Sequence, residues 1–186
     1  MLTLPSPLHP LFVHLPIALT LLVPAFAVGA LVAIRRGTPT RRAWGITVAL
    51  LALLVGSSWA ALKTGEREEE VVEDVVAESA IHGHEEAAEA FLLATGVVLL
   101  VGAAGFVNGR IGGVARGVAT AGTLALVGAG WQVGHTGGTL AYREGAASAY
   151  ASATARPGDA PTPLASDTQA EERRSRDDDD DKEDER

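Results

Sequence analysis

The residues best suited to ligand chemistry are five histidines, in groups near the start, the middle and the end of the apolar part of the chain. They are His9, His14, His82, His84 and His135. Neutral imidazole is the commonest nitrogen ligand for haem iron, zinc, copper and nickel. The chain has no cysteine and its only methionine is Met1. Thiolate sites are therefore excluded and copper(I) is disfavoured, which leaves imidazole nitrogen and carboxylate oxygen as ligands.

Four long apolar stretches must position these histidines. They cover residues 11–34, 43–62, 87–107 and 114–133. Each is close to the roughly 20 helical residues that cross a bilayer core of about 30 Å. The sequence therefore predicts an all-α integral membrane four-helix bundle over residues 1–145. Charge is segregated in the same way, because residues 1–62 hold four arginines and no acid, whereas 63–89 hold ten acids and two bases.

The basic residues predict how the bundle is oriented in the cell membrane. Arg35, Arg36, Arg41 and Arg42 follow the first span, and Arg110 lies between the third and fourth. Positive charge beside a span favours the cytoplasmic side, so both basic loops are expected inside. The N-terminus, the C-terminus and the acidic connection then lie outside. Tryptophans are expected at headgroup level, Trp59 and Trp131 at the outer ends and Trp44 at an inner end.

Two further segments are predicted from composition. The connection 63–86 carries valines at three- and four-residue intervals between glutamates, which indicates a short surface helix. Residues 146–186 are rich in Ala, Ser, Thr and Pro and then in Asp, and such a segment buries too little apolar area to offset its ordering entropy. We therefore expect a disordered acidic tail.

The predicted topology brings all five histidines to the outer boundary of the membrane, from three separate spans. Two imidazoles from facing helices are enough to hold a haem in a bundle. The leading hypothesis is a b-type haem with His14, His84 and His135 as ligands, and with His9 and His82 as outer or alternative ligands. Axial ligation by two imidazoles leaves no open position for oxygen, so electron transfer with a redox partner is the expected role.

Other interpretations stay open at this point. The histidines could simply be amphipathic residues at the interface, with no cofactor. A non-redox module could bind zinc or another divalent metal through His82, His84 and Glu85, or could scaffold a membrane partner on the acidic segment 63–86. The sequence does not decide between a monomer and a homo-oligomer.

Several classes of function are disfavoured. The acidic balance and the lack of a basic stripe argue against nucleic acid as a partner, which leaves the lipid bilayer and a membrane or redox protein. No serine, histidine and aspartate arrangement indicates a hydrolase, so an electron-transfer or binding protein is expected rather than an enzyme. The spans lack the buried ionisable groups of a transport pathway.

Two end motifs and one internal histidine resemble a known family. They are His9-Pro10-Leu11-Phe12-Val13-His14-Leu15-Pro16, then His84, then Gly134-His135-Thr136-Gly137-Gly138-Thr139-Leu140-Ala141-Tyr142. Over residues 7–145 the chain resembles the uncharacterised prokaryotic membrane family known as domain of unknown function 2231. The resemblance implies four helices with histidines near one face, in a family suspected of binding haem. That family usually has a histidine where this chain has Glu144, so the resemblance implies one ligand lost or replaced by a carboxylate.

Overall fold

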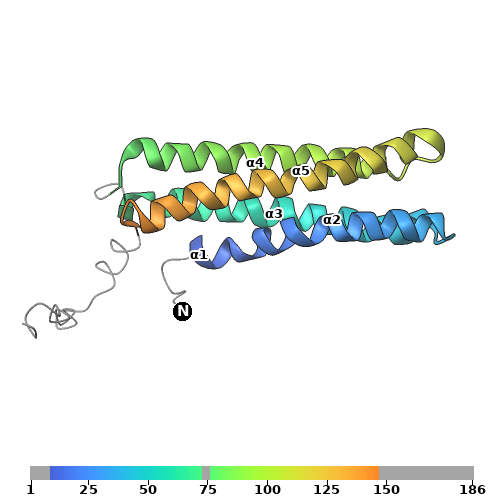
Figure 1. Cartoon of the computed structure of the whole chain (residues 1–186), viewed down its shortest axis with the longest axis horizontal. Coiled ribbons are helices and arrows are strands. Elements are labelled where there is room, and N and C mark those ends of the chain that lie inside the picture. Colours follow the sequence, from blue (N-terminus) through green and yellow to red (C-terminus); the bar gives the residue numbers. More distant parts are fainter. Residues whose placement is uncertain (1–8, 73–75, 147–186) are drawn as a thin grey trace, which may run out of the picture. The chain divides into compact units, whose positions relative to one another are not determined.

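The computed structural model describes residues 9–72 and 76–146, and all the regular secondary structure in this part of the chain is helical. The elements are α1 (His9–Phe12), α2 (His14–Arg35), α3 (Thr40–Val72), α4 (Glu78–Ala104) and α5 (Gly109–Tyr142) (Figure 1). Four of these, α2 to α5, are long and apolar enough to cross a membrane. The prediction of an all-α chain with four candidate membrane-spanning helices is therefore confirmed.

The four long helices run alternately in opposite directions (Figure 1). α2 packs on α3, α3 on α4, α4 on α5, and α5 closes the bundle by packing on α2. One end of the bundle, here called the histidine end, holds α1, the starts of α2 and α4 and the ends of α3 and α5. The opposite end, here called the arginine end, holds the loops 36–39 and 105–108. Antiparallel packing thus brings the histidine-bearing segments to one end.

The helices at the histidine end continue beyond the predicted spans. α3 runs to Val72 and α5 to Tyr142, each about ten residues past the expected limit, which is roughly 15 Å of additional helix. The prediction of a separate surface helix in 63–86 is wrong, because 63–72 continues α3 and 78–86 begins α4. Glutamate, lysine and arginine favour helix and no proline interrupts 63–72, so nothing ends α3 at the apolar boundary. The predicted tail lies, from residue 147 on, outside the described residues.

The bundle interior is apolar, and so is much of its outer surface. The central core contains Leu19, Val23, Leu51, Leu54, Phe91 and Leu126. Along the spans the outward side chains are also aliphatic, and Leu93, Leu100 and Ile111 are each more than 70% exposed. A water-soluble bundle would place polar residues there, so these faces are suited to contact with lipid.

Trp44 lies near the arginine end, as expected, but its ring is inside the bundle and not on the outer surface. Its side chain is fully buried, and its indole Nε1 donates a hydrogen bond of 2.8 Å to the carbonyl oxygen of Gly102. It packs in a second core cluster near the arginine end with Ala27, Ala30 and Ala119, whose small side chains leave room for the ring. The other two tryptophans, Trp59 and Trp131, are exposed.

A second hydrogen bond closes the same end of the bundle. The guanidinium of Arg116, on α5, donates to the carbonyl oxygen of Gly105 at 2.5 Å, just beyond the last residue of α4. Trp44 and Arg116 therefore supply side-chain donors from α3 and α5 to the carbonyl groups of Gly102 and Gly105, at the end of α4 where the regular hydrogen bonds of the helix stop.

Candidate functional site

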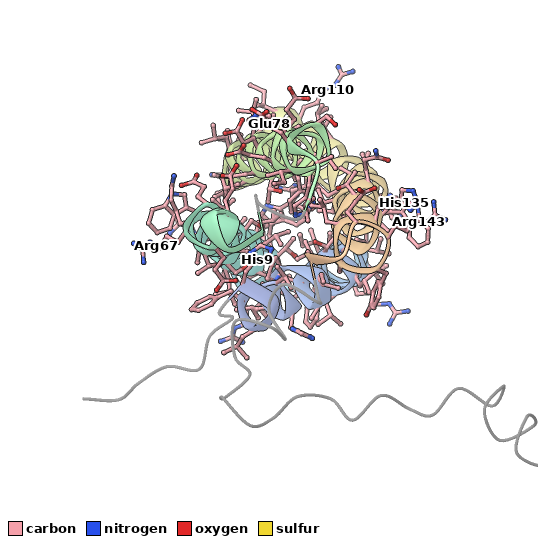
Figure 2. All side chains as sticks on the ribbon, turned by 90° about the vertical axis from the view of Figure 1, so that its left-hand side faces the viewer. His9, Arg67, Glu78, Arg110, His135 and Arg143 are labelled. Carbon is pink, nitrogen blue, oxygen red and sulfur yellow. The ribbon has the colours of Figure 1, made fainter. Side chains whose placement is uncertain are left out.

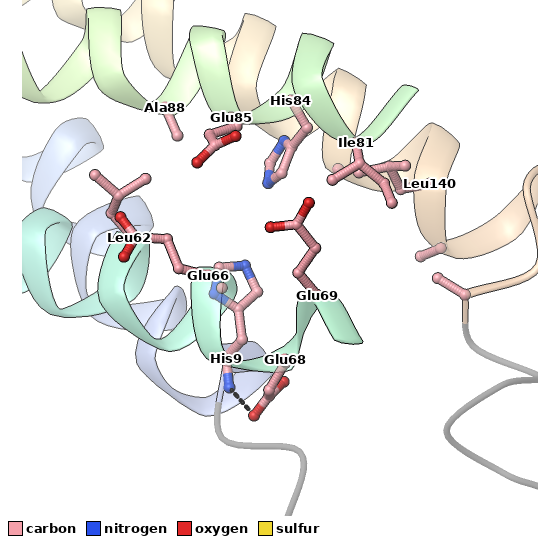
Figure 3. Close-up of a pocket in the computed structure, with 14 residues that line it drawn as sticks. His9, Leu62, Glu66, Glu68, Glu69, Ile81, His84, Glu85, Ala88 and Leu140 are labelled. Atoms are coloured by element: carbon pink, nitrogen blue, oxygen red, sulfur yellow. Dashed lines mark hydrogen bonds between the residues drawn. The ribbon is translucent and has the colours of Figure 1, made fainter. Parts of the chain in front are cut away.

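A cavity of about 270 Å³ lies at the histidine end, between the last turns of α3 and α5 and the first turns of α4 (Figure 3). Its polar lining consists of two histidines and four glutamates: His9, His84, Glu66, Glu68, Glu69 and Glu85. The other lining residues are aliphatic or glycine. The cavity is thus formed by the parts of α3 and α5 that extend past the predicted spans, together with the opening turns of α4.

The two cavity histidines form a close pair. The imidazole of His9, on α1, and that of His84, on α4, have ring centroids 6.3 Å apart and planes at 85°. Both rings are only partly exposed. Two segments distant in sequence therefore present paired nitrogen ligands to one cavity.

The hydrogen bonds of His9 determine which of its nitrogens carries the proton. Its Nδ1 lies 2.8 Å from the carbonyl oxygen of Ala61, and a carbonyl can only accept. In the neutral ring the proton is therefore on Nδ1, and Nε2 keeps the lone pair that binds a metal. The backbone N–H of His9 donates to Glu68 at 3.2 Å, which also holds α1 against α3.

His84 is in the same tautomer for a related reason. Its Nδ1 lies 2.9 Å from the hydroxyl of Thr136, on α5. That hydroxyl has a single proton, which it donates to carbonyl oxygens of its own helix, Val133 at 3.0 Å and Gln132 at 3.2 Å. With this proton on a carbonyl, the hydroxyl accepts from His84 Nδ1–H, and Nε2 of His84 is then also the available ligand atom. Ligating histidines commonly donate their second nitrogen to a protein oxygen in this way.

Glycines on two helices make room for these rings. A Cβ atom at Gly65, on α3, would lie 3.3 Å from the ring of His9. A Cβ atom at Gly137, on α5, would lie 3.0 Å from Cε1 of His84. Gly137 belongs to the same end motif as His135, yet in the structure it accommodates His84.

The remaining predicted site residues lie elsewhere at the same end. His14 is exposed on the first turn of α2, and His135 is exposed on the outer side of α5, beside Tyr142 and Arg143 (Figure 2). His82 is exposed and lies 3.6 Å from both Glu78 and Glu85. Of the predicted set His14, His84 and His135, only His84 lines the cavity, and its partner there is His9.

The alternative zinc set is not gathered around one point either. His82 and His84 are two residues apart on one helix, which directs their side chains to different faces. Within the ranges 9–72 and 76–146, no group of three or more histidine or acidic side chains is arranged to hold a metal ion.

The four cavity carboxylates differ in their partners. Glu66 pairs with Lys63 at 2.5 Å, Glu68 accepts from the backbone of His9, and Glu85 lies near His82. Glu69 has no hydrogen bond or ion pair within the described part of the chain, and its carboxylate points toward His84 (Figure 3). Sequence reasoning missed both Glu69 and Thr136. In the sequence, Thr136 is notable only because it follows His135. That position does not reveal that its side chain faces α4.

The fold and the site together define a class of protein, a helical bundle of membrane-spanning type with a paired-imidazole cavity at one end. No protein-family model, no curated protein and no solved structure matches this chain.

Proposed function

We propose that this chain is a multi-pass membrane protein that binds one b-type haem through His9 and His84 and exchanges single electrons with a partner. The observation that carries the proposal is the pairing of two imidazoles whose Nδ1–H groups are both held by protein oxygens. The two ring centroids are 6.3 Å apart, so one metal centre could be held by both residues.

The number of ligands favours haem over a bare ion. A haem brings four nitrogen ligands of its own, so His9 and His84 would be enough to hold it, whereas zinc needs three or four protein ligands. The cavity is small for a haem, because its volume of about 270 Å³ is slightly below the roughly 300–1,000 Å³ of typical ligand pockets. The donor atoms thus fit a haem iron well, and the cavity accommodates part of a macrocycle.

When bound, haem supplies a one-electron couple, and ligation by two imidazoles leaves no coordination position for oxygen. The chain contributes orientation. The carbonyl of Ala61 and the hydroxyl of Thr136 hold the two rings in the metal-binding tautomer, and the aliphatic walls formed by Leu62, Ile81 and Leu140 limit access of water.

The proposed orientation places the arginine end in the cytoplasm and the histidine end outside. The additional turns of α3 and α5 support an encounter with a partner in the aqueous phase, because they raise the cavity above the apolar spans. Membership of the family called domain of unknown function 2231 is part of the same proposal. Glu144, in place of the usual family histidine, is consistent with a single haem.

The test is the absorption spectrum of the full chain, purified in detergent after expression with ample haem. We expect a Soret band in the wild type, loss of the band in His9→Ala and His84→Ala, and a retained band in His14→Ala and His135→Ala. Absence of the band both from purified protein and after reconstitution with haem would eliminate the proposal. A band that depends on His14 or His135 would assign the ligands differently.

A second candidate rests on the carboxylates, since four glutamates line the same cavity as the two histidines. We propose as the alternative a non-redox site for zinc or another divalent cation, in which His9 and His84 are joined by Glu69. It predicts stoichiometric zinc by elemental analysis, lost in Glu69→Gln and retained in Glu86→Gln, which changes an exposed glutamate outside the cavity lining. Zinc that is also lost in His82→Ala would instead support the set His82, His84 and Glu85.

A further inference from the structure

The arginine end carries four exposed guanidinium groups around one tight turn. Arg35 and Arg36 end α2, and Arg41 and Arg42 begin α3, so two pairs flank the short connection between these helices. Arg110 is the second residue of α5, which begins at the same end, and it is also exposed. The turn therefore concentrates positive charge on a small surface.

This charge is not neutralised within the bundle. Residues 1–62 and 90–143 contain no acidic residue. Within the described part of the chain, none of these five arginines forms an ion pair, whereas Arg116 is used internally by its bond to Gly105. Each loop joins the C-terminus of one helix to the N-terminus of the next, so the helix dipoles largely cancel. The field at this end comes from the guanidinium groups.

The backbone that carries the arginines is held in place. Gly37 adopts a left-handed conformation with φ 96°, its N–H donates to Ile34, and Thr38 donates to Ala33. The cluster built around the fully buried Trp44 lies directly beneath the turn. A surface whose backbone is fixed by buried contacts binds without the cost of ordering a loop.

Apolar side chains lie beside this charge. Val32, Val107 and Ile111 are 40%, 49% and 71% exposed, within about one turn of Arg35 or Arg110 along the chain. An occupant that satisfies both features carries a phosphate group and an acyl chain. Free phosphate would satisfy only the arginines.

We propose that the arginine end is a binding surface for anionic phospholipid, with Arg35, Arg36, Arg41 and Arg42 contacting the phosphate. Basic residues next to membrane helices attract anionic headgroups, and each contributes a similar increment of binding. This inference is independent of the haem proposal, since it concerns the opposite end of the bundle and requires no cofactor.

The test is lipid binding to the full chain in neutral detergent, measured by native mass spectrometry and by titration with phosphatidylglycerol or phosphatidylcholine. We expect preferential binding of phosphatidylglycerol, weakened roughly 20-fold when two charges are removed in Arg41→Gln/Arg42→Gln. Arg41→Lys/Arg42→Lys should keep most of the affinity because the charge remains. Lys63→Gln/Arg67→Gln, at the histidine end, is the matched control and should bind as the wild type does.

Three outcomes would overturn the proposal. Phosphatidylcholine could bind as tightly as phosphatidylglycerol, or the glutamine variants could keep the wild-type preference. Inorganic phosphate could compete as well as the lipid at equal concentration, which would assign the surface to free phosphate. Arg35→Gln/Arg36→Gln serves as a second variant if Arg41→Gln/Arg42→Gln does not fold.

Discussion

The hydroxyl of Thr136, on α5, forms a hydrogen bond of 2.9 Å with Nδ1 of His84, on α4. Because the same hydroxyl donates to carbonyls of α5, the bond holds His84 in one tautomer and one orientation. The ring of His9 is held in the same way by Ala61. The ligand pair therefore depends on two neighbouring helices, α5 and α3, as well as on the helices that carry the rings.

The first prediction concerns Thr136. Thr136→Val keeps the shape of the side chain and removes the acceptor for His84 Nδ1–H, so we expect the affinity for haem to fall about 10–100-fold. The measurement is a Soret titration of the apoprotein. Thr139→Val is the control, since the Thr139 hydroxyl donates to the backbone of His135, outside the cavity. Equal affinity in Thr136→Val and wild type would show that the tautomer of His84 is not held by Thr136.

The second prediction compares adjacent glycines of α5. A Cβ atom at Gly137 would press on the ring of His84, whereas nothing lies within 4 Å of one at Gly138. Alanine in place of an unhindered helical glycine stabilises by about 0.5–1 kcal/mol. We expect Gly138→Ala to raise the free energy of unfolding by this amount. Gly137→Ala should not raise it, because the new methyl group presses on the ring of His84. Unfolding in detergent, monitored by circular dichroism, measures both values. Equal gains in both variants would mean that the ring moves aside freely.

The third prediction concerns the buried indole of Trp44. Trp44→Phe removes the indole donor to the Gly102 carbonyl oxygen, which keeps its bond from the Gly105 N–H. We therefore expect the free energy of unfolding to fall by about 0.5–1.5 kcal/mol, the net contribution of one hydrogen bond. Trp59→Phe should change the same quantity by less than about 0.5 kcal/mol, because Trp59 is exposed. Chemical denaturation in detergent gives both values. Similar losses in both variants would contradict a special role for the indole N–H.

The fourth prediction concerns the close contact at the end of α4. A Cβ atom at Gly105 would lie 2.5 Å from Nε1 of Trp44 and 2.8 Å from Cγ of Arg116. We expect Gly105→Ala to destabilise the bundle by about 1–3 kcal/mol, as overpacking does. Gly117→Ala meets open space and should not destabilise. The measurement is the midpoint of thermal unfolding of each variant. A midpoint for Gly105→Ala at or above the wild-type value would refute the expectation.

Hydropathy was sufficient for the main architecture, because an apolar helix of about 20 residues is a property of a continuous segment. It was less informative about helix ends. The glutamate-rich residues 63–72 were interpreted as part of a separate surface helix, yet they continue α3, since helix propensity does not change where apolar residues stop. The burial of the Trp44 ring was likewise missed, because it depends on the small residues that α2 and α5 present to it.

The amino-acid sequence alone predicted four apolar helices that alternate in direction. It therefore also predicted that every histidine-bearing segment lies at one end of the bundle. Only the tertiary structure decided that His84 meets His9 there, while His14, His82 and His135 are exposed. The physical reason is that hydropathy leaves the rotation of a helix about its axis undetermined. That rotation comes from interhelical contacts such as Gly137 against His84, which join residues far apart in the chain.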